Sequence, residues 1–470
     1  MSAIHLLFGV ILTISALQAG SPRILTTLDE LRHYAGQDDV TVSLAAGIYT
    51  VAADTPSVTV AVEYRETDGV LAGSRTTEAI LNFSGRNSTY LLYGVILKID
   101  TRLHAHSRNS LDKIMVSGTG NTIRGLEIVD EGDTPTRGWS VRMLHVSGDG
   151  NTLDQLGLWP RGSSPYGYGN LLGKGANSLV GLHKQTSLLV TGRDTVLRNL
   201  RIVTRAFGHG LVMQGAINTL IEDSVVEGEM RTTDDILREP SGLARSVNFR
   251  SDYPPGRIVG GQMIALSEDG VRAYPDGTAW SKRSTRDLVV RRTTVRNMRS
   301  GFDLSAMGGT VFLSDCVSIG CNEKGFAVPS GGVIERSSGD TLYGPLLSIF
   351  HRDIADCRIE LEWISGASGY PPTRFAEING RGHHIVFRTR GEAANTNPLP
   401  IVFGASFWAD VNVFRNPKVD PLTGASGIRL ENMTTMPVIL REVAEDCEII
   451  SAGALLADEG KRNRYRRTDP

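Results

Sequence analysis

The 470-residue sequence predicts an all-β fold, a right-handed parallel β-helix solenoid with a capping helix at its N-terminal end. A recurring motif and its spacing indicate this fold. The motif is an apolar pair, a glycine turn, an Asn/Asp-Thr step and alternating apolar residues, and no helical periodicity accompanies it. It occurs in MVSGTGNTIRGLEIV from Met115, HVSGDGNTLDQLGLW from His145, LVTGRDTVLRNLRIV from Leu189 and VMQGAINTLIEDSVV from Val212.

The spacing of the motif is that of one solenoid coil. Gly192 and Gly215 are 23 residues apart, and so are Gly309 and Gly332 farther along the chain. A period in the low twenties, built from short strands, is typical of a solenoid, and the spaced leucines of leucine-rich repeats are absent. Each coil would hydrogen-bond to its neighbours, so no coil is stable alone.

A second set of glycines opens strands that we expect to stack as a column. Neighbouring strands lie about 4.8 Å apart, so residues just after these glycines should line one strip of the surface. The glycines are Gly138, Gly181, Gly208, Gly270, Gly301 and Gly325. The side chains predicted for the strip are His183, Lys184, His209, Arg272 and Asp303.

The composition and the net charge of the chain limit the classes of partner that we expect it to bind. The net charge is −2 and 40% of the residues are apolar, which indicates a large core and no bias toward nucleic acid or an anionic membrane. Residues 1–19 read as a signal peptide, with a buried first strand as the alternative. We therefore expect an extracellular or periplasmic protein with no membrane span after cleavage, a monomer with one domain over residues 21–470.

The N-terminal region predicts a short helix. Thr27 and Glu30 form a capping box, and Leu28, Leu31 and Tyr34 share one face of TLDELRHYA. An alternating strand follows from Asp39. The opening pattern LDEL…VTVSLAAGIY resembles the start of many secreted β-helix polysaccharide lyases, so the chain resembles the pectin-lyase-like superfamily, without a match to one family in it. The resemblance implies that the helix covers the open end of the stack.

Two long loops interrupt the repeat, at about 155–178 and 238–286, and we expect both to flank the strip. Trp159, Tyr166 and Tyr168 of the first loop are candidate substrate-binding residues, because aromatic faces stack on sugar rings. The alternative is that these aromatic side chains fold onto the solenoid wall.

Ionisable residues concentrate at matching points of successive coils. The candidates for catalysis are Lys184, His209, Arg205, His183, Arg231, Asp234, Asp235, Glu268, Asp269 and Arg272. Such a concentration is typical of a functional site, although rows of polar side chains are also common on solenoids.

β-Elimination of a uronate polymer would use these residues in three roles. A cation must neutralise the carboxylate, a base must take the neighbouring proton, and an acid must protonate the leaving oxygen. Arg205, or else Arg231, would bind the carboxylate, while Lys184 and His209 would share the base and acid roles. The Lys/Arg pairing resembles β-helix lyases that cleave alginate and dermatan. By the same resemblance, Glu229 is a candidate ligand for Ca²⁺, with Glu227 beside it.

Two other functions stay open. A glycoside hydrolase would use paired carboxyl groups, for which Asp234-Asp235 and Glu268-Asp269 are candidates, although adjacent acids often simply form turns. A non-catalytic carbohydrate-binding or surface protein on the same frame is the third function. The acidic polysaccharide substrate of a lyase is the partner we expect.

The four cysteines are Cys316, Cys321, Cys357 and Cys447. Three follow an aspartate at apparently equivalent coil positions, which predicts a column of buried free thiols. A Cys316–Cys321 disulfide is the alternative in an exported protein.

Overall fold

The structure is a computed structural model that describes residues 21–66, 68–105, 110–135, 140–175, 178–253, 255–277, 280–364, 374–390, 399–404 and 424–468. The predicted signal peptide at residues 1–19, and Gly138 of the predicted glycine column, lie outside these residues. None of the helices in the described part of the chain is long and apolar enough to cross a membrane.

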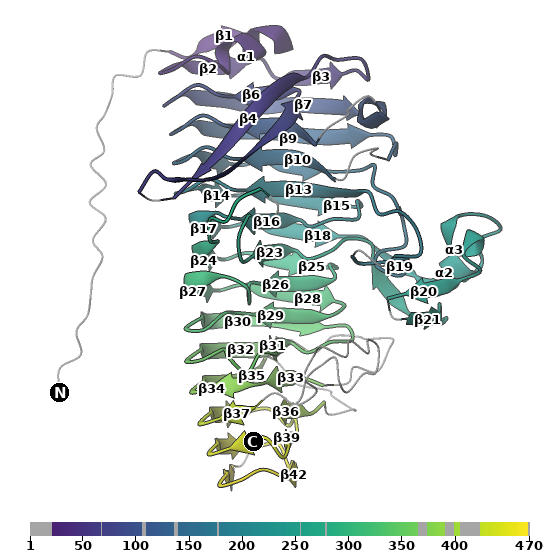
Figure 1. Cartoon of the computed structure of the whole chain (residues 1–470), viewed down its shortest axis with the longest axis vertical. Coiled ribbons are helices and arrows are strands. Elements are labelled where there is room, and N and C mark those ends of the chain that lie inside the picture. Colours follow the sequence, from purple (N-terminus) through teal and green to yellow (C-terminus); the bar gives the residue numbers. More distant parts are fainter. Residues whose placement is uncertain are drawn as a thin grey trace.

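Two long sheets run the length of the molecule and form a parallel β-helix, as predicted (Figure 1). Sheet A has 21 strands and sheet B has 15, and every pairing in them is parallel except that of the β4–β5 hairpin. The side chains between the sheets form one continuous apolar core from Leu25 to Ile449. Each coil therefore adds one layer to the same core.

Sheet B carries the outer face on which a charged pocket lies. Its strands are β4 (Val58–Arg65), β5 (Leu71–Ala79), β6 (Leu81–Phe83), β8 (Leu111–Val116), β10 (Ser140–Val146), β13 (Lys184–Val190), β16 (Leu211–Gln214), β23 (Val271–Tyr274), β26 (Ser300–Asp303), β29 (Lys324–Ala327), β31 (Leu347–Ile349), β33 (Ala376–Ile378), β36 (Ile401–Phe403), β39 (Val438–Leu440) and β42 (Leu455–Asp458).

Sheet A forms the rest of the wall. Its strands are β1 (Arg23–Leu25), β2 (Thr41–Leu44), β3 (Gly47–Val51), β7 (Thr89–Asp100), β9 (Thr122–Glu131), β11 (Thr152–Asp154), β12 (Gly157–Trp159), β14 (Val196–Arg198), β15 (Arg201–Thr204), β17 (Ile217–Glu222), β18 (Val225–Gly228), β24 (Arg286–Arg291), β25 (Thr294–Arg296), β27 (Gly308–Ser314), β28 (Val317–Cys321), β30 (Val333–Thr341), β32 (Arg358–Ile364), β35 (His384–Arg390), β38 (Arg429–Asn432), β41 (Glu448–Ser451) and β43 (Arg464–Arg467). A small third sheet contains β34 (Gly380–Arg381), β37 (Ala425–Ser426) and β40 (Ala444–Glu445).

The coils turn at residues that tolerate left-handed backbone. Asp315, Asp356 and Asp446 have φ near +55°, a conformation in which Asp and Asn are enriched. Each N–H of these residues donates to a carbonyl of the next coil. The cysteine that follows each aspartate is buried.

All four cysteines are buried free thiols, as the spacing predicted. The alternative disulfide between Cys316 and Cys321 is wrong, because both thiols are free. Burial raises the pKa of the Cys316 thiol to about 12. The thiols therefore pack as small apolar side chains.

The predicted N-terminal helix is present as α1 (Leu28–Tyr34) with its complete capping box. The Thr27 side chain accepts from the Glu30 N–H, and Leu31 is fully buried in the main core. Figure 1 places α1 at the N-terminal end of the stack. Its role in covering the open end stays a prediction.

A side lobe, residues 160–175 and 229–266, projects from the coils (Figure 1). It contains α2 (Thr233–Leu237), α3 (Leu243–Ser246) and the antiparallel strand pairs β19 (Met230–Thr232) with β22 (Met263–Ala265) and β20 (Arg250–Asp252) with β21 (Pro255–Arg257). The lobe has its own apolar cluster, which joins Tyr168 and Leu172 to Ile236 and Ile264. The two loop segments therefore pack against each other.

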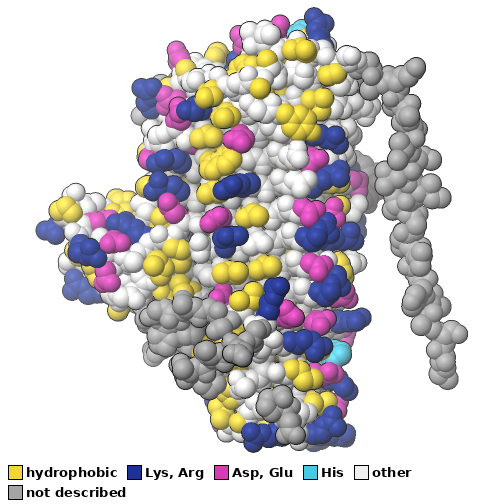
Figure 2. All heavy atoms as spheres, turned by 180° about the vertical axis from the view of Figure 1, so that it is seen from behind, with side chains coloured by type: hydrophobic (Ala, Val, Ile, Leu, Met, Phe, Trp, Pro, Cys, Tyr) yellow, Lys and Arg dark blue, Asp and Glu magenta, His cyan; other side chains and the backbone are white. Residues whose placement is uncertain are grey.

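The face of the molecule that is turned away from the viewer in Figure 1 carries both positive and negative side chains. In Figure 2, Lys and Arg side chains alternate with Asp and Glu side chains along the coils. Exposed pairs such as Arg292–Asp223 and Arg462–Asp446 link one coil to the next. No large area of one sign is visible on this face.

Candidate functional site

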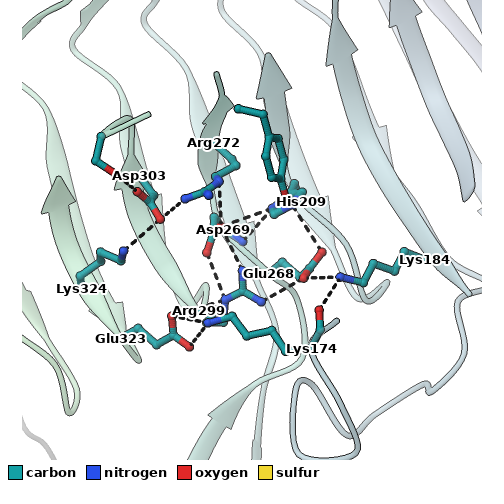
Figure 3. Close-up of polar contacts among 12 residues, drawn as sticks. Lys174, Lys184, His209, Glu268, Asp269, Arg272, Arg299, Asp303, Glu323 and Lys324 are labelled. Atoms are coloured by element: carbon teal, nitrogen blue, oxygen red, sulfur yellow. Dashed lines mark hydrogen bonds and ion pairs between the residues drawn. The ribbon is translucent and has the colours of Figure 1, made fainter. Parts of the chain in front are cut away.

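A charged pocket of about 340 Å³ opens on the outer face of sheet B, beside β23. Figure 3 shows the polar side chains that converge there. Its lining residues are Lys174, Lys184, Glu268, Asp269, Arg272, Tyr274, Arg299, Asp303, Ser305, Ala306, Glu323, Lys324, Phe350 and His351. Five cationic and four anionic side chains are in this set, so the pocket is strongly polar with nearly balanced charge.

The register of sheet B brings these side chains together. Leu211 pairs with Val271, Val271 with Phe302, and Phe302 with Phe326. The glycines that precede these four residues therefore stack in a column made of Gly210, Gly270, Gly301 and Gly325. The predicted column is right at its last three positions and wrong at the other two described ones. Gly208 lies two residues before Gly210, and Gly181 lies six residues before Ser187, which pairs beside Gly210.

Glu268 is the centre of the network. Its carboxylate lies 2.6 Å from Lys184 Nζ, 2.9 Å from Arg299 and 3.5 Å from His209 Nε2. Arg299 also bonds both oxygens of Asp269, at 3.0 and 3.1 Å. A buried guanidinium thus holds two buried carboxylates, while Lys184 extends toward the pocket.

The carboxyl groups of this network are held ionised. Burial alone would raise the pKa of Glu268, but the charges of His209, Lys184 and Arg299 lower it well below its ordinary value. Arg299 lowers the pKa of Asp269 in the same way. Lys324 and Arg272 lower that of Asp303. These three groups are therefore carboxylates at neutral pH and cannot donate a proton.

Lys174, from the side lobe, is the lysine of the pocket whose pKa is lowered from its ordinary value. Burial lowers the pKa of Lys174 to about 8, although the neighbouring Glu323 carboxylate opposes the shift. Its Nζ lies 2.9 Å from Glu323 and 2.8 Å from the Tyr253 hydroxyl. An amine with a pKa near neutrality can act as a general base.

His209 and Tyr274 are joined by a hydrogen bond beside the pocket. His209 Nε2 lies 3.0 Å from the Tyr274 hydroxyl, and Nδ1 accepts the Asp269 backbone N–H at 3.3 Å. Burial lowers the pKa of His209 to about 4 and raises the pKa of Tyr274 to about 12. At neutral pH the imidazole is therefore uncharged with its proton on Nε2, and the phenol is protonated.

Arg272 and Lys324 lie on the far side of the pocket. Both bind the Asp303 carboxylate, Lys324 at 3.0 Å. The Arg272 guanidinium also lies 4.8 Å from the ring centre of Tyr274. Its side chain is 21% exposed, so it reaches the open part of the pocket.

The structure brings six sequence-predicted residues to one place: Lys184, His209, Glu268, Asp269, Arg272 and Asp303. His209 was expected at the surface, but its side chain is only 7% exposed and lies behind the lining. The pairing of neighbouring coils buries it between Glu268, Asp269 and Tyr274.

Other predicted catalytic residues lie outside the lining. Arg205 pairs with Glu229 at 2.5 Å, with both side chains more than 40% exposed. Arg231 binds Glu239 and the Gly167 carbonyl within the side lobe. His183 joins the lobe through backbone hydrogen bonds with Ser164.

The predicted Asp234-Asp235 carboxyl pair is also elsewhere. Asp234 accepts the Gly261 N–H in a lobe turn, and Asp235 lies in the first turn of α2 beside Thr232 and Arg238. These contacts are the turn-forming contacts that the sequence left open as the alternative.

The predicted sugar-stacking aromatic residues do not line the pocket. Tyr168 is 6% exposed in the lobe cluster, where its hydroxyl donates to Glu239 at 2.6 Å. Tyr166 lies against Arg205, and Trp159 ends β12 in sheet A. For Tyr168 the structure therefore shows the alternative, an aromatic side chain used for packing.

Metal binding finds no support in the side-chain arrangement. Within the residues that the structure describes, no three His, Cys, Asp or Glu side chains are grouped so that they could hold a metal ion. Glu229, the candidate calcium ligand, is occupied by its ion pair with Arg205.

Sequence reasoning missed Lys174, Tyr274, Arg299, Glu323 and Lys324. A signal existed for Tyr274, because it lies two residues after Arg272 and therefore on the same face of β23. Lys324 directly precedes a glycine of the column. Lys174 and Arg299 come from a loop and a coil corner, where no periodicity points to them.

Comparison with known proteins identifies no family for this chain. No protein-family model matches the sequence. No curated protein matches it either. At these low similarities, the solved structures below say nothing about what this chain binds or cleaves.

One similar structure is a mannuronic acid specific polysaccharide family 6 lyase from the human gut microbiota, with 12% identity and a TM-score of 0.43 over 95% of this chain and 84% of that one. Another is the alginate lyase AlyF-OU02 in complex with G6, with 12% identity and a TM-score of 0.41 over 94% of this chain and 86% of that one. A third is the periplasmic alginate epimerase AlgG, with 10% identity and a TM-score of 0.26 over 88% of this chain and 95% of that one.

Proposed function

We propose that this protein is an exported enzyme that cleaves a uronate-containing polysaccharide by β-elimination in the pocket around Glu268. One observation carries the proposal. Cations hold the pocket carboxylates Glu268, Asp269 and Asp303 ionised, whereas Lys174 has a pKa of about 8 and Tyr274 keeps its proton at neutral pH. This combination suits elimination beside a carboxylate better than hydrolysis by two carboxyl groups.

Arg272 and Lys184 bind the substrate carboxylate in this proposal. Both side chains are partly exposed, at 21% and 28%, on opposite sides of the Glu268–Asp269 pair. Neutralising the uronate carboxylate makes the proton on the adjacent carbon more acidic. Arg205, which the sequence favoured for this role, is outside the pocket and pairs with Glu229.

Lys174 is the proposed base. With a pKa of about 8, a substantial fraction of Lys174 is uncharged at neutral to mildly alkaline pH. Its Nζ takes the proton from the carbon next to the carboxylate. The electron pair of that C–H bond forms the carbon–carbon double bond, and the glycosidic C–O bond breaks.

Tyr274 is the proposed acid. The His209 Nε2–H points at the Tyr274 oxygen, so the phenol can direct its own proton into the pocket. That proton goes to the leaving glycosidic oxygen. A proton then returns from Lys174 to Tyr274 through solvent, which restores both groups. His209 thus positions Tyr274 in place of serving as the acid or base itself.

The glycoside hydrolase alternative lacks a proton donor of the usual kind. Such an enzyme needs one carboxyl group with a raised pKa to protonate the leaving oxygen. The pKa values of Glu268 and Asp269 are lowered instead.

Incubation with a panel of uronate polymers separates the three functions. A lyase produces the ultraviolet absorbance of an unsaturated uronate together with new reducing ends. A hydrolase produces reducing ends without that absorbance, and a binding protein produces neither. An increase in the number of reducing ends without the ultraviolet absorbance of an unsaturated uronate would overturn the elimination proposal.

A further inference from the structure

The outer face of sheet B is covered on the N-terminal side of the pocket. Strand pairing aligns Met115, His145, Leu189 and Val212 in one outward row that continues into Arg272. The first four are only 0%, 0%, 1% and 3% exposed. A groove running along the coils would leave this row open, so the site does not continue in that direction.

The β4–β5 hairpin covers the first part of this row, at Met115 and His145. Figure 1 shows it lying diagonally across the stack. Its side chains Val60, Val62 and Tyr64 form an apolar cluster with Met115 of β8, and Trp280 packs against the cluster. Arg75 reaches beneath the hairpin to bind Asp112 and lies 4.5 Å from the ring centre of Trp280.

The loop after β23 fastens the hairpin next to the pocket. This loop begins directly after Tyr274, and its Ser281 pairs with Gly73 of β5. Arg283 donates to the Arg65 carbonyl of the hairpin at 3.0 Å and to the Gly215 carbonyl at 2.6 Å. The loop after β23 and the hairpin therefore form one wall of the pocket. This wall is anchored at Gly215, directly after β16, the strand that pairs with β23.

The same outward row is buried again beyond the pocket. Asp303 pairs with Ala327, and farther along Ser348 pairs with Glu377. Ala327 and Glu377 are 0% exposed and Ser348 is 4% exposed. The site is thus closed in both directions along the solenoid axis.

The side lobe forms a third wall. Its Lys174 bonds Glu323, and its Met263 N–H donates to the Tyr343 hydroxyl at 2.7 Å. Asn322 bonds the backbone of Ala265 and Met263. These contacts fix the lobe to the coils that carry the pocket.

We infer that the site accepts the end of a polysaccharide chain and that the enzyme cleaves exolytically. Walls on three sides leave no path for a polymer to continue past the reacting sugar on both sides. This inference rests on the proposed lyase function and adds the mode of attack to it.

Product sizes during digestion of a long, cleavable uronate polymer test the inference. We expect one short product size from the earliest time points, with solution viscosity falling slowly relative to ultraviolet absorbance. A broad ladder of early products with a rapid loss of viscosity would overturn exolytic cleavage and leave the lyase function standing. Absence of absorbance with every polymer would overturn the lyase function, and the inference with it.

A wall variant provides a second test. Trp280→Ala removes the ring that packs against the apolar cluster and Arg75 of the hairpin, so longer products should increase at least several-fold among the early products. Tyr93→Ala, an exposed aromatic residue of β7 in sheet A, is the matched control and should leave the product sizes unchanged. Unchanged products in a folded Trp280→Ala variant would contradict the wall model. If that variant does not fold, the wild-type product sizes alone decide.

Discussion

Lys184 Nζ lies 2.6 Å from Glu268 Oε1, in an ion pair whose carboxylate is 3% exposed and whose ammonium reaches the pocket. Arg299 and His209 hold the rest of the same carboxylate. Replacing the Glu268 carboxylate should leave the buried Arg299 guanidinium and the Lys184 ammonium without this partner, and breaking a buried ion pair costs about 3–5 kcal/mol.

Glu268→Gln should therefore lower the free energy of unfolding by about 3–5 kcal/mol, measured by chemical denaturation. Glu360→Gln is the control, because Glu360 pairs with Arg388 at the surface, and it should change stability by less than about 1 kcal/mol. Equal effects of the two substitutions would show that the Glu268 network does not stabilise the fold.

Lys174→Met should lower turnover by about 10²- to 10⁴-fold, because it removes the proposed base. In the wild type, kcat/KM should rise with pH through about 8 as Lys174 loses its proton, and this rise should be absent from the residual activity of the variant. Lys98→Met, at an exposed pair with Glu131, should behave like the wild type. A pH profile that Lys174→Met leaves unaltered would exclude Lys174 as the base.

Tyr274→Phe should reduce kcat by about 10²-fold or more and change KM little, since only the proton donor is lost. The ring and its contact with Arg272 remain, so thermal stability should stay close to that of the wild type. Steady-state kinetics on the best polymer of the panel measure both constants. Full activity in the variant would move the acid role to another group.

Arg272→Ala should raise KM by roughly 10- to 100-fold, in keeping with about 1.5–3 kcal/mol for a hydrogen bond to a charged group. Arg205→Ala should leave KM nearly unchanged, because Arg205 pairs with Glu229 outside the pocket. The reverse result, with the larger effect at Arg205, would restore the assignment that the sequence favoured.

Acid should destabilise the protein partly through His209. Its pKa falls from 6.5 to about 4 on folding, mainly through burial. Between these pH values the unfolded chain binds a proton at this residue and the native protein does not, so stability falls as pH falls from 6.5 toward 4. His145 and His104, whose pKa values burial also lowers, act in the same direction.

His209→Gln should make that pH dependence shallower, by at most about 1.4 kcal/mol per pH unit for one proton. Chemical denaturation at several pH values between 4 and 7 provides the measurement. His33→Gln, at an exposed histidine of α1, is the control and should keep the wild-type slope. An unchanged slope in His209→Gln would mean that His209 titrates normally in the native protein.

The sequence by itself determined that the chain folds into stacked coils of a solenoid. Glycine turns, Asn/Asp corners and alternating apolar residues are local requirements of a solenoid, and they predicted the parallel β-helix. The Thr27–Glu30 capping box predicted helix α1, and the spacing of the Asp-Cys pairs predicted the buried thiols. Side chains alternate between the faces of a strand, so the same pattern also placed Lys184, His209 and Arg272 near one another. The error at Gly208 left His209 in the right coil but not at the surface, where it had been expected.

Only the tertiary structure decided which groups meet at the pocket. Residues 215–270 separate β16 from β23 and include β17, β18 and the 229–266 segment of the side lobe, and no periodicity across them shows that Gly210 stacks on Gly270. Lys174 and Arg299 enter from a loop and a corner, while Arg205, Asp234 and Tyr168 are used elsewhere. The pKa values depend on burial and on charges brought together from five coils and a lobe, and those distances do not exist until the chain has folded.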